Sequence, residues 1–109
     1  MEPNELERGK VFSFPEIVDY AGGAVVSRTI IKRPLGTVTV FSFDKGEGLS
    51  EHTAAFDALV NIVDGTADII INGKSNILHA GQFIIMPANI PHAVKAVEKF
   101  KMVLVMIKS

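Results

Sequence analysis

Beyond residue 21, hydrophobic positions in this chain follow the period of β-strands, and no helical period is present. Short segments of β-branched, aliphatic and aromatic residues alternate with turn residues, which is typical of a sandwich or barrel. Asn72-Gly73 favours a tight hairpin, because both positions of that turn need a positive φ. The pattern therefore predicts an all-β domain. The segments expected to be strands are 25–31, 37–43, 59–63, 67–71, 77–79, 83–86, 93–97 and 100–107.

One short helix is expected before the first strand. Ser13 supplies a capping hydroxyl, Pro15 suits the first helical turn, and Glu16 follows at once. The helix is predicted from Pro15 to Tyr20, where Gly22-Gly23 ends it. We accordingly divide the chain into an N-terminal segment, residues 1–24, and a barrel, residues 25–109.

The last strand, residues 100–107, is apolar on both faces except at Lys101. Such a strand must be covered by the barrel interior on one side and by a second layer on the other. In so small a chain another subunit is a candidate for that layer. Together with the β-rich segment 25–32, the strand predicts a homodimer.

Composition narrows the possible partners. The 109 residues suit one domain, and 48% of them are hydrophobic. The sequence has no cysteine, which excludes disulfides, thiolate metal sites and cysteine nucleophiles. Its 11 basic and 12 acidic residues are dispersed, so no nucleic-acid surface is expected. The polar start and the lack of a long apolar run predict a cytoplasmic protein without a membrane partner.

Two glycine-led motifs lie among the predicted strands. The first has a glycine, five residues, a tripeptide that begins with histidine, and two further spaced positions: Gly46, His52-Thr53-Ala54, Ala58 and Gly65. The second has a glycine, five residues, a tripeptide that begins with proline, then a histidine and a last spaced position: Gly81, Pro87-Ala88-Asn89, His92 and Ala96.

These motifs resemble those of the cupins. The first cupin motif is glycine, five residues, His-x-His, three or four residues, glutamate, six residues and glycine. The second is glycine, five residues, Pro-x-Gly, two residues, histidine, three residues and asparagine. Every spacing matches, and Asn89 is an easy replacement for glycine because both accept a positive φ. The resemblance covers residues 37–107 and implies a small cupin with a double-stranded β-helix, or jelly-roll, barrel.

The sequence departs from the cupin pattern at the positions that hold a metal. The resemblance assigns ligands to two histidines and a glutamate of the first motif and a histidine of the second. Of these, His52 and His92 remain, whereas Ala54 and Ala58 replace a histidine and the glutamate. Two imidazoles alone are a poor metal site.

Two interpretations of the histidine pair stay open. They hold a divalent transition metal (zinc, iron, nickel or manganese), or they are hydrogen-bonding groups in a metal-free barrel. Asp57 is a possible third ligand, but strand alternation turns it away from the face of Ala58 unless a bulge intervenes. The methionines at 86, 102 and 106 are expected to fill the core.

The two alanines enlarge the barrel interior and make it more apolar, which favours a small-molecule pocket. The residues expected to line it beside the histidines are Ala54, Phe56, Ala58, Val60 and Asn89. Our first hypothesis is a binding module, and no catalytic residue is assigned. The alternatives are a metal-dependent dioxygenase or isomerase, and a metal-free structural or assembly protein.

Overall fold

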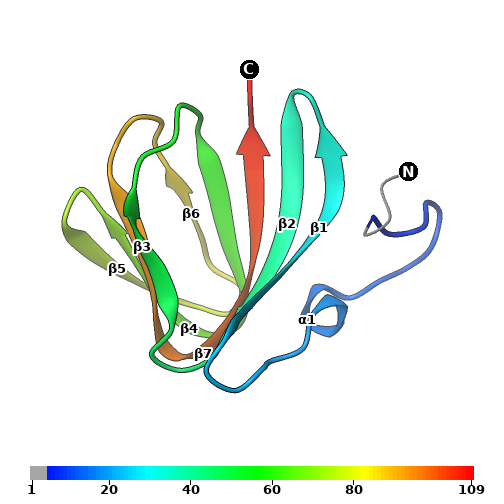
Figure 1. Cartoon of the computed structure of the whole chain (residues 1–109), viewed down its shortest axis with the longest axis horizontal. Coiled ribbons are helices and arrows are strands. Elements are labelled where there is room, and N and C mark those ends of the chain that lie inside the picture. The colour runs from blue at the N-terminus through cyan, green and yellow to red at the C-terminus, as the bar shows by residue number, and fades with distance from the viewer. Residues whose placement is uncertain (1–4) are drawn as a thin grey trace.

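The computed structural model describes residues 5–109 and confirms the all-β expectation (Figure 1). Seven strands follow one short helix in this part of the chain. Their bounds are α1 Phe14–Ile17, β1 Val25–Arg33, β2 Gly36–Phe43, β3 Gly48–His52, β4 Ala58–Ile71, β5 Lys74–His79, β6 Phe83–Met86 and β7 His92–Ile107.

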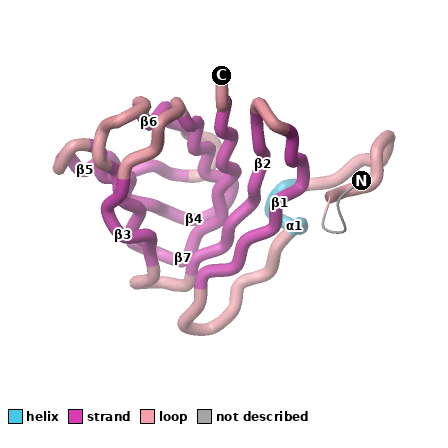
Figure 2. Tube along the Cα trace, turned by 45° about the horizontal axis from the view of Figure 1, so that its top comes forward, coloured by secondary structure: helices cyan, strands magenta, loops and turns pink. Residues whose placement is uncertain are grey.

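All strands belong to one antiparallel sheet. Its main path is β1-β2-β7-β4-β5, while β3 pairs with β7 and β6 pairs with β4. The two longest strands, β4 and β7, therefore carry partners along both halves of their length. Figures 1 and 2 show the sheet curling, so that β1 and β2 rise on one side and β3, β5 and β6 on the other.

The sequence predicted a break at Asp64-Gly65, but β4 runs through it as a single strand. The β4–β7 register shifts between Ile62 and Asp64 and again between Gly65 and Ala67. Gly65 has φ +78°, and a Cβ there would lie 1.9 Å from the carbonyl oxygen of Lys99. The turn-like residues thus form a bulge that bends the strand instead of ending it. On β7, the predicted strands 93–97 and 100–107 are likewise continuous.

The strand β3 was not expected from the sequence. It is mostly exposed and pairs with β7, with Gly48 opposite Lys95. A Cβ at Gly48 would lie 2.2 Å from the carbonyl oxygen of Val94. Glycine therefore allows β3 to approach β7 closely enough to pair, a requirement that its own sequence does not reveal.

The barrel interior holds the larger of two apolar clusters. At its centre Phe43 and Phe100, both fully buried, stack with ring centroids 4.5 Å apart. The second cluster lies on the other face of the sheet, where Val18 of the N-terminal segment packs with Ile30 and Val103. The chain's own N-terminal segment thus supplies part of the second layer that β7 was predicted to need.

The helix α1 is shorter than predicted, because the chain after it is held extended against the sheet. Val18 has extended backbone angles and is buried, and the Asp19 carbonyl accepts a hydrogen bond from Ser42 Oγ at 2.7 Å. The Tyr20 hydroxyl donates to Asp64, and burial together with this contact raises the pKa of Tyr20. The Lys101 amine lies 4.7 Å from the Tyr20 ring centroid. Within residues 5–109, no helix has the length and apolar character needed to cross a membrane.

Candidate functional site

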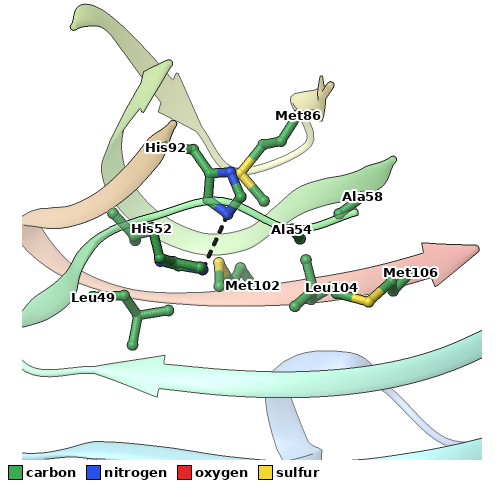
Figure 3. A pocket seen from close by; sticks show the side chains of 10 residues that line it. Leu49, His52, Ala54, Ala58, Met86, His92, Met102, Leu104 and Met106 are labelled. Atoms are coloured by element: carbon green, nitrogen blue, oxygen red, sulfur yellow. Dashed lines mark hydrogen bonds between the residues drawn. The ribbon is translucent and has the colours of Figure 1, made fainter. Parts of the chain in front are cut away.

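The first and second motifs meet where β3 ends and β7 begins. His52 is the last residue of β3, His92 is the first residue of β7, and the two are direct partners in the ladder. Their Nε2 atoms lie 3.1 Å apart, and the ring planes make an angle of 70° (Figure 3). The strand pairing therefore brings together two imidazoles that are forty positions apart in the sequence.

Backbone carbonyls fix the orientation of both rings. Nδ1 of His52 lies 2.7 Å from the Ser50 oxygen, and Nδ1 of His92 lies 3.3 Å from the Ile90 oxygen. A carbonyl only accepts, so each Nδ1 must carry a proton to make its contact. Two neutral rings then have no proton left for the contact between the Nε2 atoms. A further cation, either a proton or a metal ion, is needed to satisfy all three contacts at once.

Burial makes the protonated form of His92 unfavourable. Its side chain is buried, whereas His52 is exposed at the end of β3. Desolvation lowers the pKa of His92, and the nearby His52 lowers it further, against an opposing effect of the Ile90 carbonyl. The neutral ring is therefore the favoured form of His92 at neutral pH.

The two imidazoles open onto a cavity of about 50 Å³ inside the barrel. Apart from the rings, its walls are apolar side chains from β3, β4, β6, β7 and the loop after β3: Leu49, Ala54, Ala58, Met86, Val94, Met102, Leu104 and Met106. Because a water needs about 10–15 Å³ by this measure, the cavity has room for about three or four waters. The site therefore combines a small apolar chamber with one polar edge.

The residues predicted to line the pocket divide into two groups. Ala54 and Ala58 do line the cavity. Phe56, Val60 and Asn89 are not among its lining residues. Val60 is fully buried in the core cluster, and Phe56 is 36% exposed.

The backbone of Asn89 connects two loops beside the cavity. It has φ +64°, and its N–H donates to the Ala54 carbonyl at 2.7 Å. A positive φ is what the spacing of the second motif led us to expect at this position. The hydrogen bond joins the loop before β7 to the loop after β3, and so holds the wall of the cavity at Ala54.

Asp57 stands apart from the histidines. Its Oδ1 accepts a hydrogen bond from the Ala88 N–H at 2.8 Å, and the residue is exposed. Within residues 5–109, no group of three or more histidine, aspartate or glutamate side chains is placed to hold a metal ion. The imidazole pair thus lacks the third nitrogen or oxygen donor that zinc or non-haem iron usually takes.

Sequence reasoning missed six of the lining residues: Leu49, Met86, Val94, Met102, Leu104 and Met106. Four of them lie on β7, and counting in steps of two from His92 reaches every one of these four. That signal was present in the sequence, but it is useful only once β7 is known to be continuous.

Comparison with known proteins gives a family and a set of similar structures. The Cupin domain family matches residues 39–108. A conserved protein of unknown function from Streptococcus pyogenes is 40% identical, with a TM-score of 0.92, over 97% of this chain and 93% of that one. A cupin 2 conserved barrel domain protein from Leptotrichia buccalis is 42% identical, with a TM-score of 0.86, over 89% of this chain. The match spans only 47% of that protein.

More distant structures share the fold alone. Salicylate 1,2-dioxygenase from Pseudoaminobacter salicylatoxidans is 12% identical, with a TM-score of 0.72, over 76% of this chain and 25% of that one. The comparison with curated proteins found no match. The motif spacing, the curled antiparallel sheet and the matched residues agree, and the chain belongs to the cupin family.

Proposed function

We propose that this protein binds a small molecule in its barrel, with an apolar part in the cavity and a polar part at His52 and His92. The observation that carries the proposal is the contrast between the apolar walls and the two converging ring nitrogens. Apolar chambers with a few convergent polar groups are the usual form of small-molecule sites.

The cavity volume limits what enters. About 50 Å³ accepts about three or four heavy atoms, so the rest of a larger ligand must remain at the mouth. Four buried atoms contribute at most about 6 kcal/mol, which corresponds to a dissociation constant of about 40 μM. We therefore expect a short aliphatic chain with a polar head group, bound at micromolar to millimolar concentrations.

The test is a titration of metal-free protein with short-chain aliphatic carboxylates and the matching alcohols, followed by calorimetry and melting temperature. Binding should raise the melting temperature by mass action. Ala54→Leu narrows the cavity and should abolish the response, whereas Ala55→Leu, at an exposed neighbour outside the lining, should keep it. Failure of the whole panel, or an unchanged response in Ala54→Leu, contradicts the proposal.

A weakly held divalent metal at His52 and His92 is the second part of the proposal. Only two nitrogens support it, so the ion should dissociate readily. Elemental analysis of protein purified without a histidine tag measures this directly. Less than about a tenth of a metal per chain would also remove the dioxygenase and isomerase alternatives, which need a resident metal.

The homodimer predicted from β7 belongs to the same proposal. Val103 and Val105 lie in an apolar groove on the outer face of the sheet, beside the exposed Phe83. A second copy would cover this groove. Sedimentation at micromolar concentration should give a dimer, and Val105→Lys should give a monomer that keeps its fold. A wild-type monomer would refute the prediction.

Cytoplasmic localisation and the lack of nucleic-acid partners also remain predictions of composition. Fractionation of cells that express the untagged chain tests the compartment. Gel-shift titration with mixed duplex DNA tests the second prediction, and binding that weakens steeply with salt would contradict it.

A further inference from the structure

The methionines of the described chain are concentrated at one place. The sequence has four methionines, and Met86, Met102 and Met106 all line the cavity that His52 and His92 close. Met86 and Met102 are 4% and 1% exposed. Three thioethers therefore share a chamber of about 50 Å³ with two imidazoles, whose Nε2 atoms lie 3.1 Å apart.

Strand register places two of these thioethers on either side of Ala58. Ala58 pairs with Met86 on β6 and with Met106 on β7, and directly paired residues project from the same face of a sheet. Met102 projects into the cavity from further back along β7. Figure 3 draws the sulfur of Met86 beside the ring of His92 and the sulfur of Met102 beside the ring of His52. The Met106 sulfur lies on the far side of Ala54 and Leu104 from the rings.

The spacing of the two Nε2 atoms suits ligands of a single ion. Metal–nitrogen bonds of about 2.0–2.1 Å that meet at tetrahedral or right angles place two nitrogens about 2.9–3.4 Å apart. Both Nδ1 atoms face backbone carbonyls, which is the outer contact that metal-binding histidines usually make. A metal ion would also be the cation that the proton count of this pair requires.

The donor set selects among metals. Imidazole nitrogen and thioether sulfur are neutral, and no carboxylate or thiolate lines the cavity. Desolvation cost rises with the square of the charge, so a dry chamber with neutral donors disfavours a divalent ion relative to a monovalent one. Thioethers are soft ligands that favour copper(I), whereas magnesium, calcium and manganese prefer oxygen.

We propose that this cavity is a copper(I) site, in which Nε2 of His52 and His92 and the thioether sulfurs of Met86 and Met102 bind the ion. The proposal rests on the function proposed above, because it uses the same cavity, and it adds a soft metal ion to the species that this cavity binds. The methionines then serve as ligands in addition to filling the core. No oxidation or reduction of the ion is implied.

The test is anaerobic competition for copper(I) between untagged protein and the chromophoric chelator bicinchoninate. Wild-type protein should take one copper(I) per chain from the chelator, and His52→Ala should weaken this binding. Met86→Leu and Met102→Leu should each lower the copper(I) affinity at least about tenfold, the lower limit for loss of a metal-supporting group. Leucine conserves the apolar volume, so these variants should fold.

Two controls separate ligation from packing. Met106→Leu is the same substitution in the same cavity, but the sulfur lies away from the rings, and it should leave the affinity within about threefold of wild type. Zinc(II) affinity, which depends on the imidazoles, should be equal in all three leucine variants. X-ray absorption of the copper(I) complex should show sulfur neighbours beside nitrogen.

Two results would overturn the copper(I) proposal. One is wild-type copper(I) affinity in both Met86→Leu and Met102→Leu, with nitrogen as the only neighbour of the ion. The other is copper(I) binding no tighter than in a His52→Ala/His92→Ala double variant. Neither result affects the small-molecule proposal, because that proposal is tested separately by the titration of metal-free protein with carboxylates and alcohols.

Discussion

Ala58→Glu puts a carboxyl group into the cavity at the position where the first motif of metal-binding cupins has one. Ala58 is 2% exposed and faces the chamber between Met86 and Met106. The substitution adds four heavy atoms, and the chamber has room for about three or four waters, so crowding contributes little. The main effect is the burial of a carboxylate among apolar side chains.

The expected cost follows from the pKa of a buried glutamate. Burial of this kind raises the pKa by about 3–4 units above its ordinary value of about 4.3, which lowers the free energy of unfolding by about 4–5 kcal/mol at pH 8. The folded state then binds more protons than the unfolded state between the two pKa values. Stability of Ala58→Glu should therefore fall as pH rises through this window and recover near pH 4–5.

The assay is urea unfolding at pH 8 with a chelator, where the lowered pKa of His92 leaves that ring uncharged. Ala58→Gln is the matched control, because it has the same shape without the charge and should cost only about 1–3 kcal/mol. With the chelator left out, manganese(II) at a hundredfold excess over its dissociation constant should return about 2.7 kcal/mol to Ala58→Glu, and the same concentration should return none to Ala58→Gln. Equal stability of the two variants at pH 8, with no response to metal, would refute the placement of Ala58 in a dry chamber beside the histidines.

Three further predictions test the packing and hydrogen bonds of the barrel that holds the site. Phe100→Ala removes the buried ring stacked on Phe43 and should cost about 3–5 kcal/mol in urea unfolding. Leu35→Ala, at a 65% exposed position outside the outer groove, should change stability by less than about 0.5 kcal/mol. Asp57→Ala removes the hydrogen bond from the Ala88 amide, so hydrogen exchange at Ala88 should accelerate and the free energy of unfolding should fall by about 1 kcal/mol. A decrease in bound metal in this variant would instead indicate that Asp57 is a metal ligand. Hydrogen bonds from the backbone N–H groups of Gly23 and Lys45 lower the pKa of Asp44. The stability that these bonds contribute is fully present above the pKa of the unfolded state, and it is lost as pH falls through the lower pKa of the folded state. Asp44→Asn should remove that part of the acid dependence measured by urea unfolding between about pH 2 and 6, and an unchanged pH profile would contradict it.

The fold was largely predictable, because period and motif spacing are local properties of the sequence. Spacing placed His52 in the first cupin motif and His92 in the second, and the structure pairs them directly. Local pattern could not show that Asp64-Gly65 is a bulge, since the need for glycine comes from the carbonyl of Lys99 on another strand. Likewise, the helix ends early because Val18 packs on the sheet, which is a tertiary contact.

The site was less predictable than the fold. How deep a side chain lies in the barrel, and which side chains it meets there, depend on the register between strands. Val60 shares the inward face with Ala58, as alternation requires, but it lies in the closed core beyond the cavity. Asp57, adjacent to Ala58, is directed to the loop at Ala88, again as alternation requires. The convergence of Met86 and Met102 on the histidines depends on two separate pairings of β4, with β6 and with β7. No local pattern carries that information.

The most direct test of a binding cavity beside the histidines is NMR of metal-free protein labelled at the methionine methyl groups, titrated with xenon. Xenon enters dry apolar cavities without needing a specific head group. The methyl resonances of Met86, Met102 and Met106 should shift together and saturably, and Ala54→Leu should suppress the shifts. Methyl resonances that do not respond to xenon would mean that the barrel is closed and filled by its own side chains, as in the structural or assembly alternative.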